Sequence, residues 1–184
     1  MTRPPDSGIP AAPRKGRRWW LAGGVALGAA GAGLGGRWWQ ERRQAPPAEP
    51  PWPLVFPRPE GGELRMAALY GRPLVLNFWA TWCPPCVEEL PELDRFHRAW
   101  GPRGWQVVGL AVDAPTPVRE FLARLPLGFP VGLAGLQGSE LSRQLGNERG
   151  ALPFTVVFAA DGRIVQRKLG QTTFDELAAW AAAL

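Results

Sequence analysis

The sequence predicts an α/β fold in which a central mixed sheet carries helices on both faces. Two observations lead to this prediction. Short apolar runs alternate with segments whose apolar residues recur at helical spacing, which is typical of a β-α-β-α unit. A hairpin signal and a helix-capping pattern then follow toward the end of the chain. We assign residues 52–184 to this domain, which is long enough to bury a hydrophobic core without staples.

The first half of the predicted domain alternates strand and helix. Residues 74–79 are a short apolar run that follows a proline, as expected for a buried strand. Residues 87–100 carry apolar side chains at helical spacing, and residues 105–112 form a second buried run. A further helix is indicated by the apolar positions between 118 and 125.

The second half is predicted to hold a short helix, a β-hairpin and a last helix. The segments are a helix from Ser139 that Gly146 stops, strands over 154–159 and 163–169, and a helix from 173 to about Ala182. Asp161-Gly162 between the two strands favours a tight hairpin turn. The Thr-Phe-Asp-Glu sequence at 173–176 is a capping box that opens the last helix.

The net charge of +5 belongs to the N-terminal segment. Residues 1–50 carry eight Lys or Arg and three Asp or Glu, whereas residues 51–184 carry thirteen of each. The predicted domain is therefore neutral and has no basic stripe for a nucleic-acid face, so no nucleic-acid partner is expected.

Residues 19–36 contain no charge and would span about 27 Å as a helix, close to the thickness of a bilayer core. Tryptophan pairs stand at both borders, and the preceding cations favour a cytoplasmic N-terminus. We predict a cytoplasmic basic tail over 1–18, a transmembrane anchor or uncleaved signal over 19–36 and a Pro-rich linker over 37–51. A cleaved signal, including one of the twin-arginine type, is the alternative, and each version places the domain outside the cytoplasm.

The chemistry is predicted to lie in the segment 82–86, Trp-Cys-Pro-Pro-Cys. The two cysteines fall between a buried strand and a helix, and a helix N-terminus favours the thiolate that attacks disulfides. Cys83 stands first and is assigned the attacking role, while Cys86 resolves the mixed disulfide. The pair forms the predicted redox-active disulfide. With one histidine and no further cysteine, a four-ligand zinc site is excluded, and neither metal nor cofactor is expected.

Residues 77–86, Asn-Phe-Trp-Ala-Thr-Trp-Cys-Pro-Pro-Cys, followed by Glu89 and Pro91, resemble the TlpA/ResA family of extracytoplasmic thioredoxin-like proteins. The resemblance extends over roughly residues 54–184. It implies a thioredoxin-like fold on a membrane anchor in the bacterial inner membrane, with the domain in the periplasm. It also implies reduction of protein disulfides, for example in cytochrome c maturation or copper-site assembly. A membrane protein that passes thiol electrons outward is the implied electron donor.

The resemblance assigns roles to further residues. It implies that Pro153 is a cis-proline beside the cysteines and that Leu152 pairs its backbone with a bound substrate chain. Trp82 is expected to shape the substrate-binding rim. Cytoplasmic thioredoxins carry an aspartate where this chain has Asn77, and the family pattern gives the proton-accepting role to Glu89, which shares a helix face with Cys86. Glu88 is interpreted as solvated, and Asp113 as the polar end of a strand.

Three other functions are alternatives to the reductase. Peroxiredoxins place a threonine three residues before the reactive cysteine, whereas Ala80 occupies that position here. A disulfide-inserting oxidant has the same chemistry, because direction follows from reduction potential and not from the motif. A non-enzymatic module that binds Cu(I) or unfolded apoproteins through its two thiolates is the remaining alternative.

Overall fold

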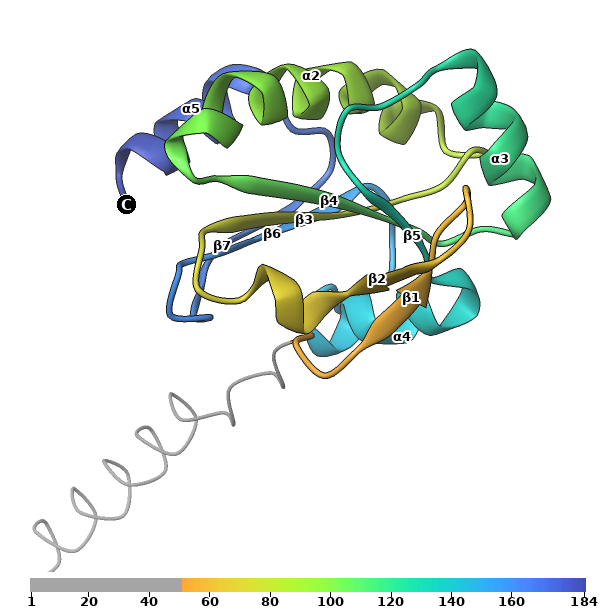
Figure 1. Cartoon of the computed structure of the whole chain (residues 1–184), viewed down its shortest axis with the longest axis horizontal. Coiled ribbons are helices and arrows are strands. Elements are labelled where there is room, and N and C mark those ends of the chain that lie inside the picture. Colours follow the sequence, from red (N-terminus) through yellow and green to blue (C-terminus); the bar gives the residue numbers. More distant parts are fainter. Residues whose placement is uncertain (1–50) are drawn as a thin grey trace, which may run out of the picture. The chain divides into compact units, whose positions relative to one another are not determined.

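The computed structural model describes residues 51–184, and a five-stranded mixed sheet lies at their centre (Figure 1). The strands of this sheet, in spatial order, are β5 (Val131–Leu133), β4 (Gln106–Ala111), β3 (Leu74–Trp79), β6 (Phe154–Phe158) and β7 (Ile164–Leu169). The helices are α2 (Pro84–Trp100), α3 (Pro115–Arg124), α4 (Gly135–Gln144) and α5 (Phe174–Ala182). The predicted basic tail, anchor and all but the last residue of the linker lie outside the described residues.

Strand direction divides the sheet into two parts. β3, β4 and β5 run parallel, so their carboxyl ends lie at one edge of the sheet. β6 runs antiparallel to β3 and continues through the Asp161-Gly162 turn into β7. The predicted mixed sheet and hairpin are confirmed.

Two apolar layers cover the two faces of the sheet. All six residues of β3 are buried, and alternate side chains point to opposite faces. Val75 and Trp79 pack in the layer formed with α2, α3 and α5. Leu74, Leu76 and Phe78 pack in the layer formed with α4 and a small N-terminal hairpin. Helices thus cover both faces, as predicted, and α2 and α5 lie along the same face of the sheet (Figure 1).

Several short elements were not predicted. They are the hairpin strands β1 (Val55–Pro57) and β2 (Glu63–Arg65), the 3₁₀ turns Met66–Leu69 and Gly101–Arg103, and β5. Each contains three or four residues, too few for a periodic pattern to emerge.

Helix α4 starts four residues before the predicted position at Ser139. The first turn of α4 contains two glycines, which disfavour helix, so the sequence pattern does not predict this earlier start. At Gly138 a Cβ atom would lie 2.7 Å from the Ala134 Cβ and 3.0 Å from the Val112 Cγ2. Glycine therefore allows α4 to approach the end of β4 closely. Among residues 51–184 no helix combines the length and apolar composition needed to cross a bilayer.

Candidate active site

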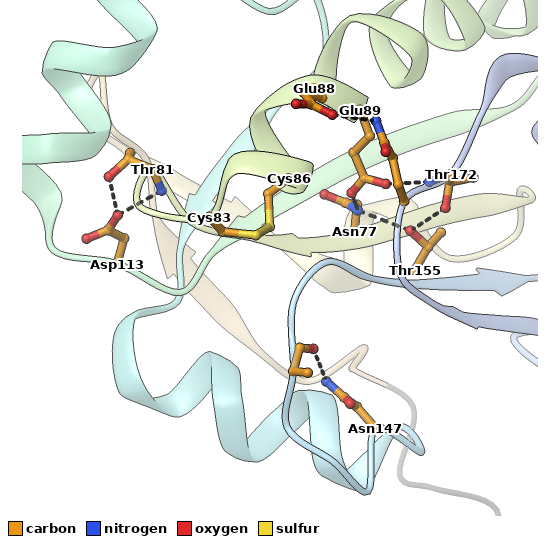
Figure 2. The surroundings of a disulfide bond; sticks show 12 residues. Asn77, Thr81, Cys83, Cys86, Glu88, Glu89, Asp113, Asn147, Thr155 and Thr172 are labelled. Atoms are coloured by element: carbon orange, nitrogen blue, oxygen red, sulfur yellow. Dashed lines mark hydrogen bonds between the residues drawn. A yellow bond between two sulfur atoms is a disulfide. The ribbon is translucent and has the colours of Figure 1, made fainter.

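The two cysteines lie at the start of α2, shortly after the end of β3 (Figure 2). Cys83 is the N-cap of α2, and two prolines occupy the first helical positions, where a missing N–H is tolerated. The Cys83 carbonyl accepts hydrogen bonds from the backbone N–H of Cys86 at 3.0 Å and of Val87 at 3.1 Å. This first turn holds the Cα atoms of Cys83 and Cys86 5.3 Å apart, and their sulfurs form a disulfide.

The two cysteines are both buried, but to slightly different degrees. Cys86 is fully buried, whereas Cys83 retains 5% of its surface. A partner can therefore reach Cys83 before Cys86, which is the geometry that the assigned order of attack requires. Trp82, the residue before Cys83, is 66% exposed.

Glu89 is fully buried one turn after Cys86 on α2. Its Oε1 accepts a hydrogen bond from the Asn77 side-chain amide at 2.6 Å, and its Oε2 accepts one from the Thr172 backbone N–H at 2.7 Å. Burial raises the pKa of Glu89 from 4.5 to about 7, although these hydrogen bonds and the charge of Lys168 favour the ionised form. A carboxyl with this pKa gains and loses protons near neutral pH, as an acid–base group must.

A cluster of buried polar side chains surrounds that carboxyl. Asn77 donates to the Thr155 hydroxyl at 3.1 Å, and the Thr172 hydroxyl lies 3.4 Å from that of Thr155. Thr155 and Thr172 are fully buried and were missed by the sequence reasoning. Thr155 stands opposite Asn77 in the β3–β6 register, so strand pairing could have located it once the register was known. By contrast Glu88 is exposed, as predicted.

Asp113 has a larger role than the predicted end of a strand. It follows β4, next to the carboxyl end of β3, and its Oδ2 accepts hydrogen bonds from the Thr81 N–H at 2.9 Å and hydroxyl at 2.6 Å. Its Oδ1 accepts from the Ala114 N–H at 2.7 Å. Asp113 thus fixes the turn that leads into Cys83, and Figure 2 shows this contact beside the disulfide.

We expect Asp113→Ala to destabilise the fold by about 1–3 kcal/mol, because three donors lose their acceptor. It should also slow disulfide reduction through Cys83 several-fold, since the turn before Cys83 is released. Asp161→Ala is the matched control, because Asp161 likewise accepts a backbone N–H, that of Arg163, but in the exposed β6–β7 turn. Denaturant unfolding and reduction rates check both variants, and equal reduction rates for the two would contradict the assignment.

Pro153 immediately precedes β6, and the Leu152–Pro153 peptide bond is cis, as the family resemblance implied. The β3–β6 register pairs Phe78 with Phe154, which places Pro153 at the edge of the sheet where β3 ends and the cysteine turn begins. Leu152 is half-buried and packs against the apolar layer that contains both cysteines. The Asn147 side chain, which sequence reasoning missed, holds this segment by donating to the Ala151 carbonyl at 2.8 Å.

No group of three or more His, Cys, Asp or Glu side chains within residues 51–184 is arranged to hold a metal ion. The site offers one cysteine disulfide and one buried carboxyl that is surrounded by polar side chains.

Comparison with known proteins supports this picture. The family described as Redoxin matches residues 44–182. The thiol-disulfide oxidoreductase ResA of Bacillus anthracis is 29% identical over 119 residues, which is 64% of this chain and 66% of ResA. The chain thus spans just under two thirds of the length of that curated relative.

Solved structures agree in fold. A secreted disulfide oxidoreductase of Mycobacterium tuberculosis, homologous to E. coli DsbE, is 26% identical with a TM-score of 0.61, over 74% of this chain and 99% of that one. A thioredoxin-related protein of Neisseria meningitidis serogroup B is 26% identical with a TM-score of 0.63, over 71% of this chain and 97% of that one. The resemblance to the TlpA/ResA proteins is confirmed, and because the family match spans most of its length, the chain belongs to the Redoxin family.

Proposed function

We propose that this protein is a thiol–disulfide oxidoreductase that reduces protein disulfides by dithiol–disulfide exchange at Cys83 and Cys86. One observation carries the proposal: the Cys83–Cys86 disulfide stands at a helix N-terminus, one turn from a buried carboxyl, and Cys83 is the less completely buried of the two cysteines. Cys83 attacks the substrate disulfide, Cys86 displaces the substrate, and Glu89 takes the proton that Cys86 must lose. Trp82, Leu152 and Pro153 form the surface that receives the substrate chain.

The family resemblance supports the proposed direction and substrates. Similarity to ResA proteins supports a reductase, and the TlpA/ResA resemblance points to cysteines of apocytochrome c or of copper-site proteins as substrates. Such a reductase needs a supply of electrons, because the space outside the cytoplasmic membrane has no local thiol buffer. A membrane protein that transfers thiol electrons outward is the donor that fits this need.

The deciding experiment is the thiol state of the pair in living cells, trapped by rapid alkylation. A reductase keeps Cys83 and Cys86 mostly reduced, whereas a disulfide-inserting oxidant keeps them mostly oxidised. Turnover of a protein disulfide by the purified full chain must accompany the reduced state. Stoichiometric Cu(I) binding without turnover of a protein disulfide would indicate that the protein is a metal carrier and not an enzyme.

The proposal places the domain in the periplasm, held by residues 19–36 in the inner membrane with the N-terminus in the cytoplasm. The support is the uncharged stretch with tryptophans at its borders and the cations that precede it.

We expect an alkaline phosphatase fused after Leu184 to be active, because this enzyme needs the oxidising space outside the cytoplasm to form its disulfides. A reporter that works only in the cytoplasm, fused at the same residue, serves as the control and should be inactive. The reverse pattern of the two activities would overturn the proposed orientation.

A further inference from the structure

Asn77 leaves one buried hydrogen-bonding atom without a partner. Its side chain is fully buried, and its amide nitrogen donates to both Glu89 and Thr155. Its amide oxygen accepts no hydrogen bond. A buried carbonyl without a donor destabilises the fold, so such an atom calls for an explanation.

The position of that oxygen points to the cysteine pair. Asn77 lies on β3 between Val75 and Trp79, which pack in the same apolar layer as Cys86. Figure 2 shows the amide nitrogen of Asn77 turned toward Glu89 and its oxygen on the side that faces the disulfide. The amide cannot be flipped without directing its oxygen at the Glu89 carboxylate, because the two side chains are 2.6 Å apart.

The oxidised pair has no donor to offer, but the reduced pair has one. The thiol of Cys86 carries an S–H, which is a weak donor and is fully buried with its residue. Both oxygens of Glu89 are already engaged, with Asn77 and with Thr172. Each Glu89 oxygen thus already accepts one hydrogen bond, whereas the Asn77 oxygen accepts none and is the acceptor of this cluster that lacks a donor.

We propose that the Asn77 amide oxygen accepts the hydrogen bond of the Cys86 thiol in the reduced protein, so that Asn77 holds the thiol and the Glu89 carboxylate in line for proton transfer. This inference rests on the proposed function. It makes Asn77 a positioning residue for the second step of the exchange and leaves the first step to Cys83.

The second step of the exchange is the resolution of the mixed disulfide by Cys86. In the mixed disulfide, Cys83 is bonded to a substrate sulfur and Cys86 is a thiol. The Cys86 proton passes to Glu89, and the thiolate attacks the Cys83 sulfur. The Cys83–Cys86 bond forms, the bond from Cys83 to the substrate breaks, and the substrate leaves as a thiolate that takes up a proton. The protein dithiol is oxidised by two electrons, and the substrate disulfide is reduced by two.

The charged groups around the proposed proton transfer from Cys86 to Glu89 affect its pH dependence. Lys168 on β7 acts on Glu89 and also pairs with Glu176 on α5. On α2 itself, Glu88 lies within reach of the Gln171 side chain, and Glu92 accepts the Phe174 N–H at 3.0 Å. None of these groups is a partner in the hydrogen bonds that join Asn77 to Glu89 and Thr155.

Two substitutions of Asn77 separate proton handling from packing. Asn77→Leu removes the oxygen but suits an apolar layer, whereas Asn77→Asp keeps an oxygen and adds a base where apolar packing disfavours charge. We expect Asn77→Leu to slow release of substrate from a preformed mixed disulfide by about tenfold or more. Asn77→Asp should stay within a few-fold of the wild type, with a shifted pH profile. The attack of Cys83 on substrate, measured with Cys86→Ser, should be the same with either substitution.

If Asn77 served only packing, the leucine variant would release substrate from the mixed disulfide faster than the aspartate variant. That result would overturn the inference. Should neither variant fold, the infrared S–H band of the full chain carrying Cys83→Ser decides, because its only thiol is Cys86. A band at lower frequency than a free thiol supports the hydrogen bond, and a free-thiol band refutes it. If the wild type did not reduce protein disulfides, the proposed function itself would be wrong. Failure of the proposed function can therefore be distinguished from failure of the Asn77 inference.

Discussion

Cys86→Ser will accumulate stable mixed disulfides with substrate proteins through Cys83, and multiple turnover will fall to background. The reason is that Cys83, with 5% of its surface accessible, can still attack, but the buried thiol that completes the exchange is gone. Cys83→Ser should lose turnover to the same degree and trap nothing. Non-reducing gels with mass spectrometry of the trapped adducts, next to reduction of a model protein disulfide, measure both effects.

The double variant with both cysteines replaced is the control for adducts that form elsewhere, and it should trap no partner. Since the chain contains only these two cysteines, every thiol-linked adduct must involve one of them. If Cys83→Ser proved to be the variant that traps partners, the order of attack proposed from burial and from the helix N-terminus would be wrong.

Glu89→Gln should slow the Cys86 step by about a hundredfold, because it removes the base and keeps the size of the side chain. Burial raises the pKa of Glu89 to about 7, so the wild-type rate should depend on pH around neutrality and the variant should lose that dependence. The measurement is the rate of mixed-disulfide resolution between pH 5 and 9 for both proteins. Superimposable pH profiles for the wild type and Glu89→Gln would mean that Glu89 has only a structural role.

The same substitution should change stability in the opposite direction. A carboxyl with a pKa of 4.5 in the unfolded chain and about 7 in the fold binds its proton more tightly when folded, so the fold loses stability as the pH rises from 4.5 to 7. The full cost, about 3 kcal/mol, is present above pH 7. We therefore expect Glu89→Gln to be more stable than the wild type at pH 8 and the difference to vanish below pH 5, measured by denaturant unfolding.

Glu88→Gln is the matched control for both measurements. Glu88 neighbours Glu89 but is turned by about 100° on the helix, and its side chain is exposed. It should leave the rate profile and the stability difference unchanged. An effect equal to that of Glu89→Gln would mean that the general charge of α2, and not the buried carboxyl, controls the chemistry.

The sequence was most informative where elements are long and where a residue type dictates chemistry. The apolar run of β3, the helical spacing of α2 and the capping box of α5 are all present in the structure, and so is the cysteine disulfide. Each of these depends on neighbours within about one helical turn, which a linear pattern can represent.

The missed residues depend on contacts between distant segments. Asp113 binds Thr81 across 32 positions, and Thr155 binds Asn77 across 78. Threonine and aspartate at the end of a strand are common in any protein, so their type alone gives no functional signal. Their roles appear only once the register of β3, β4 and β6 brings them to the cysteine turn.

The hydrogen bond from the Thr172 backbone to Glu89 joins residues 83 positions apart. One of the two hydrogen bonds to the Glu89 carboxyl is therefore supplied by the segment just before α5, not by the motif that contains the cysteines. A short peptide or an unrelated scaffold given residues 77–91 would contain both cysteines and Glu89, but it would lack this bond and the burial that raises the pKa of Glu89 to about 7. Reproducing the buried carboxyl elsewhere would therefore require both ends of the domain.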